Sequence, residues 1–243
     1  MADSLSAEQV AEELARIEAA VDSGDTALGK LGFWKLMARV KLDPALIDAA
    51  ADQAGRVDAK AFEAFTKLRY PVWFGNLLLA MGVAEGGFLL VVAKYSSSPA
   101  SSGIALVAAA VVWSICVHSP SHWVAGRLLG MRFRCYFLGG PFPPRPGLKT
   151  DYASYLRTDP RRRAWMHASG ALATKVAPFV VLAFWAGSGA PAWSALVVLA
   201  FGMVQILTDV LLSVKTSDWK KVKRELGVAR LRGADPDDAG GGM

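Results

Sequence analysis

The sequence predicts an all-α, polytopic membrane protein with about four transmembrane helices and a small N-terminal cytoplasmic helical segment. Three observations lead to this fold class. The 243-residue chain is 53% hydrophobic yet 20% charged, with a mean hydropathy of +0.31. That balance is too apolar for an ordinary soluble domain and too charged for a bare membrane bundle. The acids also gather at one end, because residues 1–70 hold 12 acids and nine bases, whereas the rest of the chain holds nine acids and 18 bases.

The third observation is a set of four mostly apolar runs. A helix that spans a bilayer needs about 20 such residues, because each residue advances the helix by about 1.5 Å. The runs cover residues 72–93, 104–129, 164–186 and 192–214. Short turns rich in Ser, Gly and Pro follow the first and third runs. The sequence therefore predicts four spans in two hairpins.

The positions of Lys and Arg predict the orientation of these spans. Residues 131–163 hold eight bases against two acids, residues 215–224 hold five bases, and the two short turns at 96–99 and 187–191 hold none. Because Lys and Arg resist translocation, we expect both termini and the 131–163 loop on the cytoplasmic side of the cell membrane. The same topology explains the excess of bases without a nucleic-acid partner and makes the lipid bilayer the expected partner.

Three segments follow from this division. Residues 1–70 form a cytoplasmic helical cap, in which Ser6 and Gln9 are typical of a capping box and Asp43-Pro44 of a second helix start. Residues 71–215 form the four-span membrane domain. Residues 216–243 form a basic cytoplasmic helix and a tail expected to be disordered.

The two cysteines, Cys116 and Cys135, lie inside or beside apolar runs. We therefore expect buried or interface thiols, with no disulfide framework and no cysteine-based zinc site.

All three histidines lie in or at the predicted spans. His118 and His122 are four residues apart, so both imidazoles lie on one face of a helix, as two zinc ligands require. His122 and Asp209 each lie 18 residues from the outer end of their spans, at a depth of about 27 Å, and His167 lies at a similar depth. Two histidines and one carboxylate form a known set of catalytic zinc ligands. The plainer alternative is a hydrogen-bonded polar cluster without a metal.

A second pair of ionisable residues lies within the spans. Glu85 in the first span and Lys175 in the third are at depths that agree within one helical turn. Because an unpaired charge inside a bilayer is costly, we expect a structural ion pair between them, with proton handling as the alternative.

Several motifs in residues 104–225 have a family likeness. His118 and His122, followed by small residues, look like a His-Glu-x-x-His helix with serine in place of glutamate. Residues 137–142 resemble a glycine-rich membrane-associated segment, and residues 168–174 are similar to a Gly-Pro-Leu-Ala-Asn helix start. Together these motifs resemble the site-2 protease family of intramembrane zinc metalloproteases, in a short form without a PDZ domain.

The resemblance implies a zinc ion held by His118, His122 and Asp209. Ser119 occupies the position of the family's glutamate, the general base, and serine cannot take a proton from zinc-bound water at neutral pH. The Leu-Asp-Gly context around Asp209 is also lost, since Thr208 and Val210 flank it. The resemblance therefore implies a metal-binding protein whose peptidase activity is absent or strongly reduced and which holds a transmembrane helix of a partner protein.

Two alternatives stay open at this stage. One is an active intramembrane metallohydrolase in which another residue, such as His167, supplies the base; His167 as a fourth ligand would instead close the site and make the metal structural. The other is a metal-free membrane scaffold.

Overall fold

The structure is a computed structural model that describes residues 5–139, 145–211 and 217–233; the predicted disordered tail lies outside them. Four of its helices are long and apolar enough to cross a membrane: Val72–Tyr95, Pro99–Leu128, Pro160–Trp185 and Ala192–Asp209. The predicted all-α membrane architecture is confirmed, with span ends that differ from the prediction by a few residues.

Contacts divide the chain into two units. Unit 1 contains Met1–Pro71, Gly126–Arg163 and Arg224–Met243, and unit 2 contains Val72–Ala125 and Ala164–Lys223. The segment between the second and third spans thus groups with the N-terminal residues. The domain limits predicted from the sequence, residues 71–215, place the same segment in the membrane domain.

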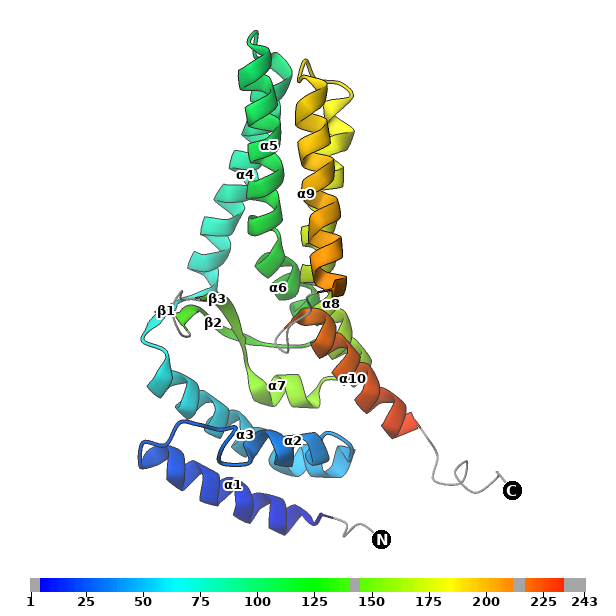
Figure 1. Ribbon diagram of the computed structural model, residues 1–243. Coiled ribbons are helices and arrows are strands. Elements are labelled where there is room, and N and C mark those ends of the chain that lie inside the picture. Colours follow the sequence, from blue (N-terminus) through cyan, green and yellow to red (C-terminus); the bar gives the residue numbers. More distant parts are fainter. Residues whose placement is uncertain (1–4, 140–144, 212–216, 234–243) are drawn as a thin grey trace, which may run out of the picture. The chain divides into compact units, whose positions relative to one another are not determined.

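The N-terminal part of unit 1 is a small helical bundle (Figure 1). Its helices are α1 (Ala7–Asp22), α2 (Phe33–Val40) and α3 (Pro44–Phe65), and α7 (Tyr152–Arg157) packs on α3. Both predicted helix starts are confirmed. The Ser6 hydroxyl accepts a hydrogen bond from the Gln9 amide and the Gln9 side chain accepts one from the Ser6 amide, while the Asp43 carboxylate caps α3 at Ala45. Because these caps satisfy amides that lack intrahelical partners, they fix where the helices begin.

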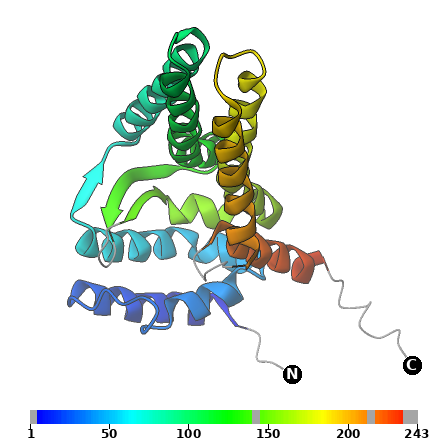
Figure 2. The same ribbon diagram turned by 45° about the horizontal axis from the view of Figure 1, so that its top comes forward.

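Unit 1 also contains a sheet that the sequence did not predict. β1 (Leu68–Tyr70), β2 (Phe133–Gly139) and β3 (Arg145–Thr150) form the strands seen in Figure 2 and pair antiparallel in the order β1-β2-β3. Arg69 lies opposite Phe137, and Tyr136 lies opposite Leu148. The sequence of β2, FRCYFLG, and that of β3, RPGLKT, lack the alternation of apolar and polar residues that indicates a strand.

In unit 2, α4 (Val72–Tyr95) packs along α5 (Pro99–Cys116), and α5 packs against α9 (Ala192–Leu211) (Figure 1). Their shared core is made largely of Ala, Leu and Val side chains. Gly86 allows α4 and α5 to approach closely, because a Cβ there would collide with the indole of Trp113, whose Nε1 donates to the Val83 carbonyl at 2.9 Å. Small residues of this kind let membrane helices pack tightly.

The second span is divided in two. α5 ends at Cys116 and α6 (His118–Leu128) begins two residues later. Pro120 explains the break, since it has no N–H to donate to the Cys116 carbonyl four residues earlier, whereas proline is tolerated in a first helical turn. His118 and His122 consequently lie in the first turns of α6. Two further helices complete the fold, α8 (Pro160–Trp185) and α10 (Asp218–Gly233). Cys116 and Cys135 are free thiols, and both are partly buried.

Candidate metal centre

The two histidines of α6 lie together as their spacing predicts. The ring centroids of His118 and His122 are 4.7 Å apart, and the ring planes are nearly perpendicular at 88°. Both side chains are partly buried, with exposed fractions of 39% for His118 and 12% for His122.

A carboxylate from α10 joins them. Asp218 Oδ2 lies 3.5 Å from His118 Nε2 and 3.3 Å from His122 Nε2. One ligand atom from each of the three residues lies within 4.8 Å of the others. All three residues belong to unit 2. Among the described residues, this is the group of His, Cys, Asp or Glu side chains whose geometry suits a metal ion.

Hydrogen bonds on the far side of the rings orient both imidazoles. His122 Nδ1 lies 2.6 Å from the Met166 carbonyl oxygen, which can only accept, so Nδ1 carries the proton and donates. His118 Nδ1 lies 3.0 Å from Thr174 Oγ1, and that hydroxyl already donates to the Gly170 carbonyl at 3.0 Å. The hydroxyl oxygen therefore accepts from His118 Nδ1 as well. In the neutral form of each ring, Nε2 then carries the lone pair.

Both Nε2 lone pairs consequently face the same anionic oxygen of Asp218. Three electron-pair donors at this separation repel one another unless a proton or a metal cation lies between them. Two ligand atoms bound to one tetrahedral zinc ion at 2.0–2.1 Å lie about 3.4 Å apart, and the observed separations of 3.3 and 3.5 Å agree with that value. The partial exposure of His118 leaves room for a fourth ligand such as water.

Packing between α6 and α8 holds the His122 ring in place. A Cβ at Gly170 would collide with three atoms of that ring, including Nε2. Glycine at this position therefore lets the ring lie directly against the α8 backbone. The Ser169 hydroxyl lies 3.1 Å from the Ser121 carbonyl and 2.7 Å from the Met166 carbonyl, which ties the two helices together at the same level.

Charge keeps the Asp218 carboxylate ionised. Burial alone would raise its pKa, but the hydrogen bond that His122 Nε2 donates when the ring is protonated and the positive charge of Lys221, whose Nζ lies 3.0 Å from Oδ1, lower the pKa of Asp218 well below its ordinary value. An ionised carboxylate is the form that binds a metal.

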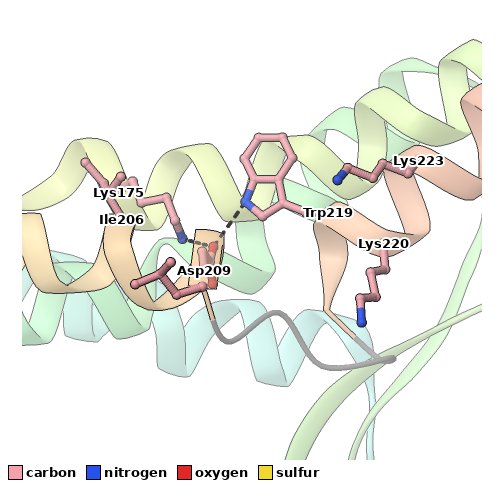
Figure 3. A pocket seen from close by; sticks show the side chains of 7 residues that line it. Lys175, Ile206, Asp209, Trp219, Lys220 and Lys223 are labelled. Atoms are coloured by element: carbon pink, nitrogen blue, oxygen red, sulfur yellow. Dashed lines mark hydrogen bonds and ion pairs between the residues drawn. The ribbon is translucent and has the colours of Figure 1, made fainter.

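Asp209 does not take the position that the sequence assigns to it. Its carboxylate forms an ion pair with Lys175, and Oδ2 accepts a hydrogen bond of 3.0 Å from Trp219 Nε1 (Figure 3). The expected Glu85–Lys175 pair is corrected by the same finding, because Lys175 is paired with Asp209 within the described chain and Glu85 lies exposed on α4. Counting helical rise gives the depth of a residue but not the direction of its side chain around the helix.

The two other predicted residues lie near the group but outside it. Ser119 is partly buried in the first turn of α6, next to His118. The ring centroid of His167 is 6.5 Å from that of His122, so His167 does not supply a fourth ligand atom within the described group.

Sequence reasoning missed Asp218. One signal was present, because Asp218 is the sole acid among the bases of residues 215–224 and follows soon after the fourth apolar run.

The chain as a whole matches no protein-family model, no curated protein sequence and no solved structure.

Proposed function

We propose that this integral membrane protein binds one divalent metal ion, zinc, through His118, His122 and Asp218. The observation that carries the proposal is the convergence of two imidazole Nε2 atoms, each fixed by a hydrogen bond at Nδ1, on one carboxylate oxygen. Zinc accepts two histidines and one carboxylate, with a fourth position for water. Hydrogen bonds at the far ring nitrogen are the usual support of metal-bound histidines.

The proposal includes a distant relation to site-2 proteases with peptidase activity absent or strongly reduced. Ser119 supports this part, because it stands where the motif needs a carboxylate base, and the loss of a general base typically slows a reaction about 100- to 10,000-fold. The protein would then act by holding a transmembrane helix of a partner. The clustered bases support cytoplasmic termini in the cell membrane.

A metal-free polar cluster is the second candidate, and one observation favours it. The 3.3 Å between His122 Nε2 and Asp218 Oδ2 is also a hydrogen-bonding distance when the imidazole is protonated. In that case a proton, and not a metal ion, would lie between the imidazole nitrogen and the carboxylate.

Metal content decides between these candidates. We expect about one zinc per chain in the detergent-purified protein by elemental mass spectrometry, and the same amount in Asp209→Asn. We expect zinc to be lost in His118→Ala and in Asp218→Asn. Circular dichroism serves as the control that all four proteins are helical.

Two outcomes would contradict the proposed zinc site. A protein that takes up no zinc even when zinc is supplied would favour the metal-free cluster. Loss of zinc in Asp209→Asn but not in Asp218→Asn would return the third ligand to the position that the sequence predicts. Chelator-sensitive cleavage of membrane-embedded test substrates by the wild-type protein would overturn the proposed loss of peptidase activity and leave the zinc site unchanged.

A further inference from the structure

A cavity of about 530 Å³ lies where α9 ends and α10 begins, apart from the three candidate metal ligands. All of its lining residues belong to unit 2. Figure 3 shows the Trp219 side chain beside Asp209 and Lys175, with the Lys220 and Lys223 side chains projecting from the same helix as Trp219. A volume of this size accommodates a small-molecule headgroup.

The lining has an apolar part and a cationic part. Ile206 and Leu211 come from the last turns of α9, the fourth apolar helix, and Leu211 is 74% exposed. Lys220 and Lys223 come from the first turns of α10 and are exposed. Trp219 is the aromatic residue of the lining, and tryptophan is enriched at the level of lipid headgroups because its ring is apolar and its N–H is polar.

The two lysines provide the net charge of the cavity. The one acid in the lining, Asp209, is neutralised by its ion pair with Lys175 and also accepts the Trp219 hydrogen bond. Neither Lys220 nor Lys223 has an ion pair within residues 5–139, 145–211 and 217–233. These lysines are three residues apart on α10, so their Cβ atoms are neighbours on the helix surface. Figure 3 shows their side chains extended in different directions, and rotation of these long side chains would bring both ammonium groups to one anion.

We propose that this cavity binds the phosphate group of an anionic phospholipid, with the phosphate on Lys220 and Lys223 and an acyl chain along Ile206 and Leu211. Lysine is a compact charge suited to phosphate. A free phosphate would bind the same lysines but would not contact the apolar part of the lining. Because the lining includes apolar side chains, it favours a lipid over free phosphate. Basic residues at the membrane surface attract anionic lipids in general, and the test must separate that effect from binding in the cavity.

Native mass spectrometry of the full chain in detergent provides the test. We expect one dioleoyl-phosphatidylglycerol to be retained in preference to dioleoyl-phosphatidylcholine. The double variant Lys220→Gln/Lys223→Gln should bind it about 10- to 30-fold more weakly. The matched control is Arg161→Gln/Arg162→Gln, which removes the same charge from the exposed start of α8 and should change binding less than twofold. Equal losses in both double variants would overturn the proposal, because they would show diffuse electrostatic attraction.

A second variant separates the lipid from free phosphate. Ile206→Trp fills the apolar part of the cavity and changes no charge, so we expect it to abolish preferential retention of phosphatidylglycerol. Inorganic phosphate or glycerol 3-phosphate should compete only at millimolar concentrations or above. Unchanged lipid retention in Ile206→Trp, or competition by inorganic phosphate as effective as that by the lipid, would overturn the assignment to a phospholipid. Neither experiment depends on metal binding.

Discussion

Each unit of the molecule contains a cluster of ionisable side chains, and the two clusters differ in exposure and in the groups that face one another. In unit 1, Glu225 is fully buried, with Lys41 Nζ at 2.7 Å and Arg163 Nε at 2.9 Å. The contact with Arg163 is at ion-pair distance without hydrogen-bond geometry. The Tyr155 ring lies 4.9 Å from Lys41 Nζ and 5.2 Å from the Arg163 guanidinium carbon. Lys41, Arg163 and the Tyr155 ring surround the carboxylate, so its negative charge is compensated by buried cations of the same unit.

The unit 2 cluster differs in its exposure to solvent and in the kind of atoms that face one another. His118, His122 and Asp218 are partly exposed, and the atoms that face one another are all electron-pair donors when the imidazoles are neutral. A buried cluster in which cations already face the carboxylate stabilises the fold. A partly exposed cluster in which lone pairs face one another has room for a cation and is stabilised by one. Exposure and donor type, and not the presence of charge, therefore distinguish a binding site from a structural ion pair.

The largest effect should come from breaking the buried cluster around Glu225. Glu225→Gln leaves Lys41 and Arg163 buried without a counter-charge, and we expect the free energy of unfolding to fall by about 3–5 kcal/mol. Urea denaturation in detergent measures this loss. The control is Glu13→Gln, which removes an exposed i, i+3 pair with Arg16 and should cost less than about 0.5 kcal/mol. Similar losses in the two variants would contradict a structural role for Glu225.

Acid should weaken the same cluster. Burial opposes ionisation, but Lys41 and Arg163 outweigh it and lower the pKa of Glu225 from 4.5 to about 2. A carboxyl whose pKa is lowered on folding adds stability that is present above pH 4.5 and is lost as the pH falls towards 2. The difference in unfolding free energy between wild type and Glu225→Gln should therefore shrink by about 3 kcal/mol between pH 6 and pH 2. A difference that stays constant with pH would show that the carboxylate charge contributes nothing.

The zinc affinity of the unit 2 cluster should also depend on the position of the His122 ring. Gly170→Ala adds a methyl group that displaces the His122 ring, and we expect zinc affinity to fall about 10- to 100-fold, measured by competition with a chelating dye. Gly87→Ala is the matched control, because nothing lies within 4 Å of its added Cβ. An unchanged affinity in Gly170→Ala would separate His122 from the metal.

The smallest effect should come from the hydroxyl that orients His118. Thr174→Val removes the acceptor of the His118 Nδ1 hydrogen bond, and we expect zinc affinity to fall about tenfold in the same competition measurement. Thr208→Val is the control, since the Thr208 hydroxyl bonds only carbonyls of its own helix among the described residues. If the two threonine variants lose equal affinity, the hydrogen bond to His118 does not tune the site.

Local features of the site followed from the sequence, and long-range ones did not. The shared face of His118 and His122 depends only on helical periodicity, and the break before α6 depends on Pro120. The choice between Asp209 and Asp218 depends on where α10 lies beside α6, about 100 residues earlier in the chain. The pairing of β2 with β3 was missed because neither strand alternates apolar and polar residues.

The sequence by itself determined the four spans, the two helix caps and the pair of histidines, because bilayer thickness, capping and helical period act within a single segment. The tertiary structure alone decided which carboxylate meets the histidines and which pairs with Lys175. The sequence does not decide these pairings, because residue number gives the depth of a residue along a helix, whereas the packing of whole helices sets the direction of its side chain and its neighbours.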